Sequence, residues 1–142
     1  MSTTMTMNTR FIFDTCFMLF MSQPGAMISA AAQEALEQKG AVFHVSAISA
    51  WEVGMLVAKG RLNLTRSPID WFDSFLIDRE ASVLDVTPSI LIAASFLPAP
   101  MHNDPADRIL VATAREHDLT IITRDRAVLA YGAAGHVKVL AC

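Results

Sequence analysis

The fold is predicted most clearly by the stretch Asn103-Asp-Pro-Ala-Asp-Arg-Ile-Leu-Val-Ala-Thr-Ala-Arg-Glu-His-Asp-Leu-Thr-Ile-Ile-Thr-Arg-Asp125. Pro105 suits the first position of a helix, which makes Asp104 the natural N-cap of a helix over 104–117. The β-branched run at 119–123 predicts a buried strand directly after that helix. A helix that leads at once into a buried strand is typical of an α/β fold.

The same alternation continues on the N-terminal side and ends in a short strand near the C-terminus. Strands are expected at 10–14, 41–45, 82–86, 119–123 and 137–140, and helices at 29–39, 46–59, 67–77, 88–97 and 104–117. Strands that alternate with helices predict a three-layer α/β/α sandwich around a central, mainly parallel sheet of four to five strands. We expect residues 1–9 to be a disordered leader and residues 10–142 to be a single domain.

The chain is apolar for its size, with 53% hydrophobic residues and a mean hydropathy of +0.40. Its best candidate for a membrane span, at 11–21, is interrupted by Asp14 and is too short to cross a bilayer. We therefore expect a soluble domain with an apolar contact surface for a partner. The two cysteines, Cys16 and Cys142, form no disulfide framework and no zinc-binding pattern, which fits a reducing cytoplasm.

Two carboxylates follow predicted strands, where ligands bind in parallel sheets. Asp14 ends the first strand, and Asp125 comes two residues after Thr123 at the end of the fourth. Both are expected at the same edge of the sheet if these strands are neighbours. The alternative is that each Asp caps the helix that follows its strand.

Two further acids lie on predicted helices. Glu52 lies inside an apolar helix that we expect to start at Ser46. A partly buried acid of this kind needs a cation to balance its charge. A capping box formed by Ser49 and Glu52 is the alternative. Asp107 falls one turn into its helix, whereas the neighbouring Asp104 is expected to serve as the cap. Carboxylates gathered at one edge repel one another unless a divalent cation lies among them, and oxygen ligands suit Mg²⁺ or Mn²⁺.

Four segments resemble the successive motifs of PIN-domain proteins of the VapC type. They are Phe13-Asp-Thr15, Val45-Ser-Ala-Ile-Ser-Ala-Trp-Glu52, His102-Asn-Asp-Pro-Ala-Asp-Arg-Ile-Leu-Val-Ala-Thr-Ala114 and Ile122-Thr-Arg-Asp125. The resemblance implies a Mg²⁺- or Mn²⁺-dependent endoribonuclease that acts as the toxin of a toxin–antitoxin pair. It implies that the catalytic, metal-binding acids are Asp14, Glu52, Asp107 and Asp125, supported by the hydroxyls of Thr15, Ser46 and Thr123.

The same resemblance implies partners as well as a site. They are an RNA substrate, a second copy of the chain in a homodimer, and a small antitoxin that occupies the acidic pocket and a hydrophobic groove. The sequence departs from the family pattern in having Cys16 where His or Asn is commoner. Its net charge of −3 is also unusual for a protein that binds RNA phosphates.

Three other classes compete with this interpretation. A phosphoaspartate enzyme of the haloacid-dehalogenase type requires a second Asp two residues after Asp14, where Cys16 stands. A phosphoacceptor, receiver-like domain requires an Asp at the end of the third strand, and Asp85 is instead followed by Val86. A catalytically inactive PIN-fold scaffold that binds proteins is opposed by the retention of all four acids.

Side chains around these motifs support weaker expectations. Arg108, Arg124 and Arg126 adjoin proposed ligands, so they are expected to hold phosphate unless they are ordinary solvated charges. A stripe at helical spacing is expected either in the core or on a contact surface: Trp71, Phe72, Phe75 and Leu76. No catalytic role is expected for the scattered histidines: His44, His102, His117 and His136.

Overall fold

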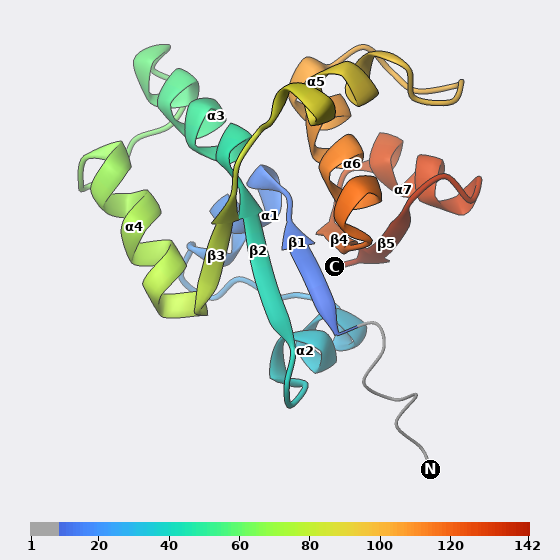
Figure 1. The fold of residues 1–142 in the computed structure, drawn as a ribbon. Helices are drawn as coiled ribbons and strands as arrows, with labels where there is room; N and C mark the ends of the chain where they lie inside the picture. Colours follow the sequence, from blue (N-terminus) through green and yellow to red (C-terminus); the bar gives the residue numbers. More distant parts are fainter. Residues whose placement is uncertain (1–8) are drawn as a thin grey trace.

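A computed structural model describes residues 9–142, and its centre is one parallel sheet (Figure 1). The strand order is β3-β2-β1-β4-β5. The strands are β1 (Arg10–Phe13), β2 (Val42–Ser46), β3 (Ala81–Leu84), β4 (Thr120–Thr123) and β5 (Lys138–Ala141). All four strand pairs are parallel. The predicted three-layer α/β/α fold is confirmed. The predicted leader lies, apart from Thr9, outside the described residues.

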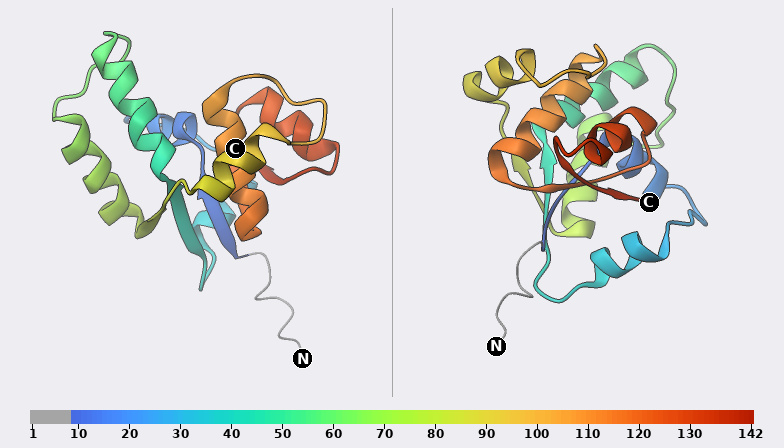
Figure 2. Two further views of the ribbon diagram at one scale, coloured as in Figure 1. Left: turned by 45° about the horizontal axis from the view of Figure 1, so that its top comes forward. Right: turned by 90° about the vertical axis from the view of Figure 1, so that its right-hand side faces the viewer.

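The sheet is covered by helices on both faces, as the view from the side shows (Figure 2). The helices are α1 (Thr15–Met21), α2 (Ala30–Glu37), α3 (Ala47–Ala58), α4 (Pro68–Arg79), α5 (Pro88–Ser95), α6 (Pro105–His117) and α7 (Arg126–Ala133). Helices α1, α2 and α4 pack on one face of the sheet, and α6 and α7 pack on the other, with α5 against α6. Helix α3 extends from the carboxyl end of β2 at the top of Figure 1.

Side-chain alternation along β1 separates the two halves of the core. Phe11 and Phe13 point into the cluster with α1, α2 and α4, whereas Ile12 points into the cluster with α6 and α7. Phe72 and Phe75 of the predicted aromatic stripe are buried in the first cluster, and Trp71 and Leu76 pack against it. The stripe is therefore part of the core, and the contact-surface alternative is wrong for Phe72 and Phe75.

Two helices, α1 and α7, were not predicted. Helix α1 starts immediately after Asp14, and α7 starts immediately after Asp125, so each strand-end acid is also an N-cap. The other elements agree with the expected ones to within two residues, including the predicted strand over 82–86, which spans Ala81–Leu84. Within the described residues, no helix is both long and apolar enough to span a membrane.

Candidate metal centre

The strand order brings the candidate acids to one edge of the sheet. Strands β1 and β4 are neighbours, with Phe13 opposite Ile122, so the residues that follow them enter the same rim. Figure 1 shows the carboxyl ends of these strands at the upper edge of the sheet. A pocket of about 360 Å³ lies at this rim. Its walls come from Asp14, Thr15, Cys16, Glu52, Asp104, Asp107, Leu110, Arg124 and Asp125. The four acids proposed from the sequence therefore line one pocket, although they come from four separate segments.

Asp14 is the most deeply buried acid of the pocket, with 4% of its surface exposed. Its Oδ1 accepts the backbone N–H of Phe17 at 2.6 Å, which caps α1, and its Oδ2 accepts the hydroxyl of Thr123. Burial raises the pKa of Asp14, although both hydrogen bonds act to lower it. Capping and placement in the pocket are thus combined in one carboxylate.

Asp125 is linked to Asp14 through a shared hydroxyl. The backbone N–H of Asp125 donates to Thr123 Oγ1 at 2.9 Å, and that hydroxyl in turn donates to Asp14. Oδ1 of Asp125 accepts the N–H of Ala127 at 3.4 Å and caps α7. Oδ2 is buried and has no hydrogen-bond partner in the described part of the chain. A buried carboxylate oxygen in this state is costly unless it binds a cation or a proton.

Glu52 is held by the hydroxyl of Thr15, which is itself hydrogen-bonded to the hydroxyl of Ser49. Thr15 Oγ1 donates to Glu52 Oε1 at 2.5 Å, and the same hydroxyl lies 2.7 Å from Ser49 Oγ. Ser46 caps α3 by accepting the N–H of Ile48, so Glu52 lies inside the helix as expected, and the alternative capping box with Ser49 does not form. Burial raises the pKa of Glu52, and the charges of Asp104 and Asp14 raise it further. From the sequence, Ser49 was considered only as part of a capping box, and its contact with Thr15 was missed, although its spacing of three residues from Glu52 places both on one helix face.

Asp104 and Asp107 have different positions at the start of α6, the first as its N-cap and the second in its first turn. Asp104 accepts the N–H groups of Ala106 at 3.0 Å and of Asp107 at 3.3 Å, as the sequence predicts for an N-cap. Asp107 projects from the first turn, and its pKa is raised to about 8. Burial is the largest cause, followed by the charges of Asp104 and Asp125. At neutral pH, Asp107 of the metal-free protein therefore holds a proton.

Carboxylates that repel one another are expected to raise the pKa of at least one of the four acids, and repulsion does contribute, but it is not the largest cause. Burial is the largest cause for Asp14, Glu52 and Asp107 alike, and repulsion between carboxylates adds to it. The pKa of the Cys16 thiol is raised to about 11 by burial and by the surrounding carboxylates, so Cys16 offers the pocket a neutral thiol.

His102 is a residue of this site that sequence reasoning missed. Its Nε2 lies 3.2 Å from Oδ2 of Asp107. His102, Asp107 and Asp125 each offer one ligand atom within 4.8 Å of the others, which makes them a possible metal-binding group. The available signal was the position of His102, two residues before Asp104 in the third motif.

The neighbouring arginines differ in what they contact. Arg108 donates through Nε to the carbonyl oxygen of Ala94 and through Nη1 to those of Met101 and His102, so it holds the backbone and the expected phosphate contact is wrong for it. Arg124 lines the pocket, and its guanidinium carbon lies 3.8 Å from the centre of the Phe20 ring. Arg126 is exposed at the start of α7.

Comparison with known proteins agrees with this fold. The family model of the PIN domain matches residues 11–133. The chain therefore belongs to the PIN domain family. It is 33% identical over 99 residues to Ribonuclease VapC22 of Mycobacterium tuberculosis (strain ATCC 25618 / H37Rv), a match that covers 70% of this chain and 74% of that protein.

Solved structures show the same fold at lower sequence identity. VapBC2 from Rickettsia felis, bound to a DNA fragment from its promoter, aligns with a TM-score of 0.69 and 14% identity over 93% of this chain and 98% of the other. A toxin–antitoxin complex from Klebsiella pneumoniae aligns with a TM-score of 0.57 and 21% identity over 92% of this chain and 95% of the other. The phosphoaspartate and receiver-like alternatives are set aside by this family membership.

Proposed function

We propose that this chain is a metal-dependent endoribonuclease that cleaves RNA phosphodiester bonds and acts as the toxin of a toxin–antitoxin pair. Its PIN domain and its similarity to a protein named Ribonuclease VapC22 support the ribonuclease activity. The observation that carries the proposal is the pocket in which Asp14, Glu52, Asp107 and Asp125 meet. Its placement at the carboxyl edge of a parallel sheet is where such folds bind ligands.

The residues of the pocket fit a hard divalent cation. Carboxylate oxygens are the donors that Mg²⁺ and Mn²⁺ prefer, and the pocket offers the four carboxylates named above. The raised pKa values of Asp14, Glu52 and Asp107 show acids that lack compensating positive charge. The buried Oδ2 of Asp125, which has no hydrogen-bond partner among the described residues, also requires a positive charge. These four acids would hold Mg²⁺ or Mn²⁺ in this proposal.

In this proposal, several residues in and around the pocket have defined tasks in cleavage. When bound, the metal supplies an activated water and charge stabilisation at the phosphate. Thr123 and the N–H of Phe17 fix both oxygens of Asp14, and Thr15 fixes Glu52, so that these carboxylates are held in place before substrate arrives. Arg124 lies at the pocket wall and offers a positive charge to an RNA phosphate.

The proposal predicts that Glu52→Gln loses cleavage while it keeps its fold. The amide oxygen of Gln still accepts the Thr15 hydroxyl, but the negative charge toward the cation is gone. We expect cleavage of a fluorogenic RNA in Mg²⁺ to fall by on the order of 100-fold, as when one transition-state-stabilising group is removed. Asp73→Asn, an exposed position on α4, is the control and should cleave like the wild type. A wild-type protein that is folded but neither binds Mn²⁺ nor cleaves RNA would instead support the inactive scaffold.

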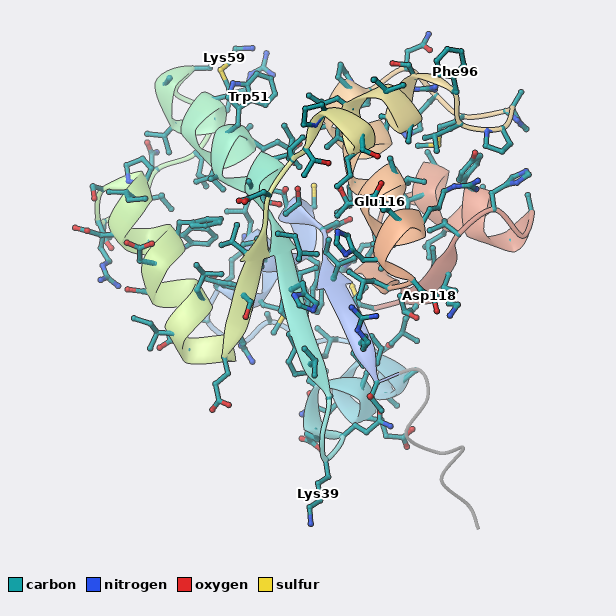
Figure 3. The ribbon with its side chains drawn as sticks, viewed as in Figure 1. Lys39, Trp51, Lys59, Phe96, Glu116 and Asp118 are labelled. Atoms are coloured by element: carbon teal, nitrogen blue, oxygen red, sulfur yellow. The ribbon has the colours of Figure 1, made fainter. Side chains whose placement is uncertain are left out.

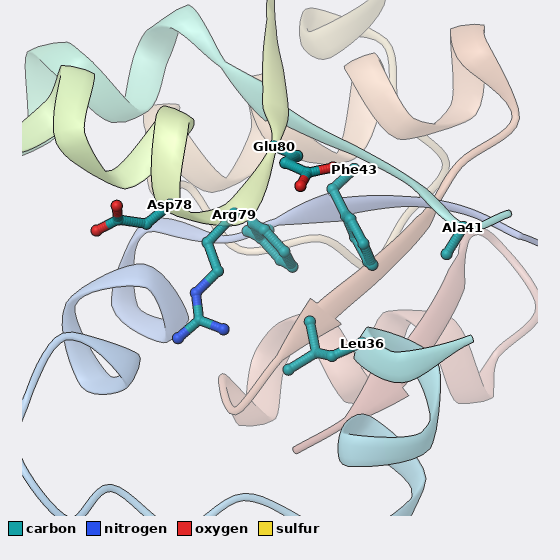
Figure 4. A pocket seen from close by; sticks show the side chains of 7 residues that line it. Leu36, Ala41, Phe43, Asp78, Arg79 and Glu80 are labelled. Carbon is teal, nitrogen blue, oxygen red and sulfur yellow. The ribbon is translucent and has the colours of Figure 1, made fainter. Parts of the chain in front are cut away.

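For the antitoxin, we propose a groove along α4. One hollow lies at the amino ends of β2 and β3 and is lined by Leu36, Ala41, Phe43, Asp78, Arg79 and Glu80 together with Phe13 (Figure 4). A second hollow shares Asp78 and Arg79 and continues along Trp71 to Arg66 and Met21. The lining combines apolar side chains with two arginines and the acids Asp78 and Glu80, so it suits a segment that carries both apolar and charged side chains. That the solved neighbours include toxin–antitoxin complexes supports this partner.

A further inference from the structure

His102 lies beside the candidate acids on a loop that is held in place by hydrogen bonds from Arg108. The loop from Met101 to Asp104 precedes α6, and Arg108 donates from within α6 to the carbonyl oxygens of Met101 and His102 at 3.3 Å each. The Nε of Arg108 also donates to the carbonyl oxygen of Ala94 at 2.9 Å, which ties the loop to α5. A guanidinium with three backbone partners is fixed in position, so the backbone of His102 is fixed as well.

The hydrogen bonds of the imidazole decide which nitrogen carries its proton. Nδ1 of His102 accepts the backbone N–H of Asp104 at 3.3 Å. In a neutral imidazole one nitrogen accepts and the other donates, so the proton is on Nε2. This tautomer follows from the direction of the Asp104 bond, because a backbone N–H only donates.

The donor on Nε2 has one evident acceptor. Nε2 is buried and makes no completed hydrogen bond within the described residues, and Oδ2 of Asp107 lies 3.2 Å away. A buried imidazole N–H without an acceptor is unfavourable, whereas a small rotation of the Asp107 carboxylate would complete this bond. The other oxygen of Asp107 then remains available to a cation.

We propose that His102 is a positioning residue, whose Nε2–H donates to Oδ2 of Asp107 and aims the remaining carboxylate oxygen at the cation. This inference rests on the proposed function, since it concerns how one of the four acids presents its oxygen. The competing role is that of a direct nitrogen ligand, together with Asp107 and Asp125. A ligand would need its lone pair on Nε2, which would move the proton to Nδ1 and break the bond from Asp104.

Mn²⁺ affinity, measured by calorimetry on the full chain without RNA, tests this role. Removal of a residue that orients a ligand typically lowers metal affinity by about 10- to 100-fold, so His102→Leu should bind Mn²⁺ that much more weakly. His102→Gln keeps an N–H donor at a similar reach and should recover most of the affinity. His117→Gln is the matched control, because His117 lies at the opposite end of α6, and it should bind as the wild type does. Thermal melting establishes that each variant is folded.

Pulsed EPR of the bound Mn²⁺ separates the two roles of His102. A positioning residue predicts no strong nitrogen coupling from an imidazole in the wild-type protein, whereas a ligand predicts one that His102→Gln removes. That coupling, or an affinity of folded His102→Leu equal to that of the wild type, would overturn the positioning role while metal binding itself stands. Failure of the folded wild type to bind Mn²⁺ would overturn the proposed function and this inference together.

Discussion

At the scale of single residues, Asp14 and Asp125 both cap helices, and the geometry of these caps is compatible with the metal binding that we propose for them. A carboxylate has two oxygens with about four acceptor sites, and a cap uses one of them. Asp125 caps α7 through Oδ1 and leaves Oδ2 unpartnered within the described chain. Asp14 accepts two hydrogen bonds, one on each oxygen, and keeps further lone pairs toward the pocket. The capping alternative considered from the sequence is therefore true for both residues and does not argue against a site.

Asp107 gives the metal-free protein an unusual dependence of stability on pH. Its pKa is about 8 in the folded chain, against 3.8 for an unperturbed Asp. Between these values the folded state keeps a proton that the unfolded state has lost, so the free energy of unfolding falls as the pH rises through this window. The contribution is fully present below pH 3.8 and is lost above about pH 8.

Urea unfolding in EDTA from pH 5 to pH 8 measures this effect. We expect the wild type to lose stability steadily over the range, and Asp107→Asn, which cannot titrate, to show a flatter profile. Mg²⁺ binds the deprotonated acids, so it should stabilise the wild type more at pH 8 than at pH 5. A wild-type stability that rises with pH in EDTA would show that Asp107 is ionised without the metal.

Some site residues were within reach of the sequence and others were not. Asp14, Glu52 and Asp125 were found because strand ends and an acid inside an apolar helix are visible in the sequence. The contacts of His102 depend on a loop held by Arg108, and no periodicity reports such a loop. Arg108 itself was misjudged, since adjacency to a proposed ligand does not reveal that its guanidinium points at backbone carbonyls.

At the scale of elements, the regular helices and strands followed from periodicity, but α1 and α7 did not. The residues of α1, Thr-Cys-Phe-Met-Leu-Phe-Met, contain no polar face, so their pattern carries no helical period. Helix α7 lies between β4 and β5 and is buried at Val128 and Tyr131. Both helices begin at an acid that was considered from the sequence as a helix cap as well as a site residue. The helix that each cap starts was nevertheless not predicted.

The packing of α7 on β5 depends on the absence of a side chain at Gly132. A Cβ built there would clash with Cγ2 of Val139 and lie 2.7 Å from Cγ1. Alanine normally stabilises a helix interior relative to glycine, but here the overlap should dominate and Gly132→Ala should destabilise the chain by about 1–3 kcal/mol.

Gly54→Ala in α3 is the matched control, because a Cβ at that position has no atom within 4 Å. It should stabilise the chain by about 0.4–1 kcal/mol, since alanine loses less conformational entropy than glycine on folding. Chemical denaturation of both variants measures the change in the free energy of unfolding, which should fall for Gly132→Ala and rise for Gly54→Ala. If Gly132→Ala is as stable as the wild type, α7 can move away from β5 at little cost, and the close packing is not a constraint.

At the scale of the whole molecule, the apolar excess divides between the core and the surface. The sequence predicted an apolar contact surface and suggested the stripe from Trp71 as its location. The structure places Phe72 and Phe75 of that stripe in the core. Large apolar side chains are instead exposed on α5, at Leu91 and Ile92, and at Phe96, which ends it. A sequence pattern of apolar residues at helical spacing does not reveal which face of the helix the sheet covers.

The exposed side chains around α5 and α3 are the surface from which we predict a homodimer. Phe96 is 81% exposed and Trp51 of α3 is 55% exposed, and Figure 3 shows both at the same end of the molecule. Ile92 and Phe96 are four residues apart and therefore share one helix face. Helices α3 and α5 both contact α6, so their exposed side chains lie on either side of the same helix. A stable interface here should be largely apolar and bury about 1,200 Å² or more in total.

Light scattering during size exclusion, at micromolar concentration and without antitoxin, tests this prediction. The wild type should elute as a dimer, and the double variant Ile92→Asp/Phe96→Asp should elute as a folded monomer, because two charges cannot be buried unpaired at an apolar interface. Ile77→Asp on α4 is the control, since Ile77 is 76% exposed but belongs to a different helix, along the proposed antitoxin groove. It should remain a dimer. A monomeric wild type would refute the dimer altogether. If Ile77→Asp alone produced a monomer, the contact between copies would lie on α4, and the antitoxin would have to bind elsewhere or compete with the second copy.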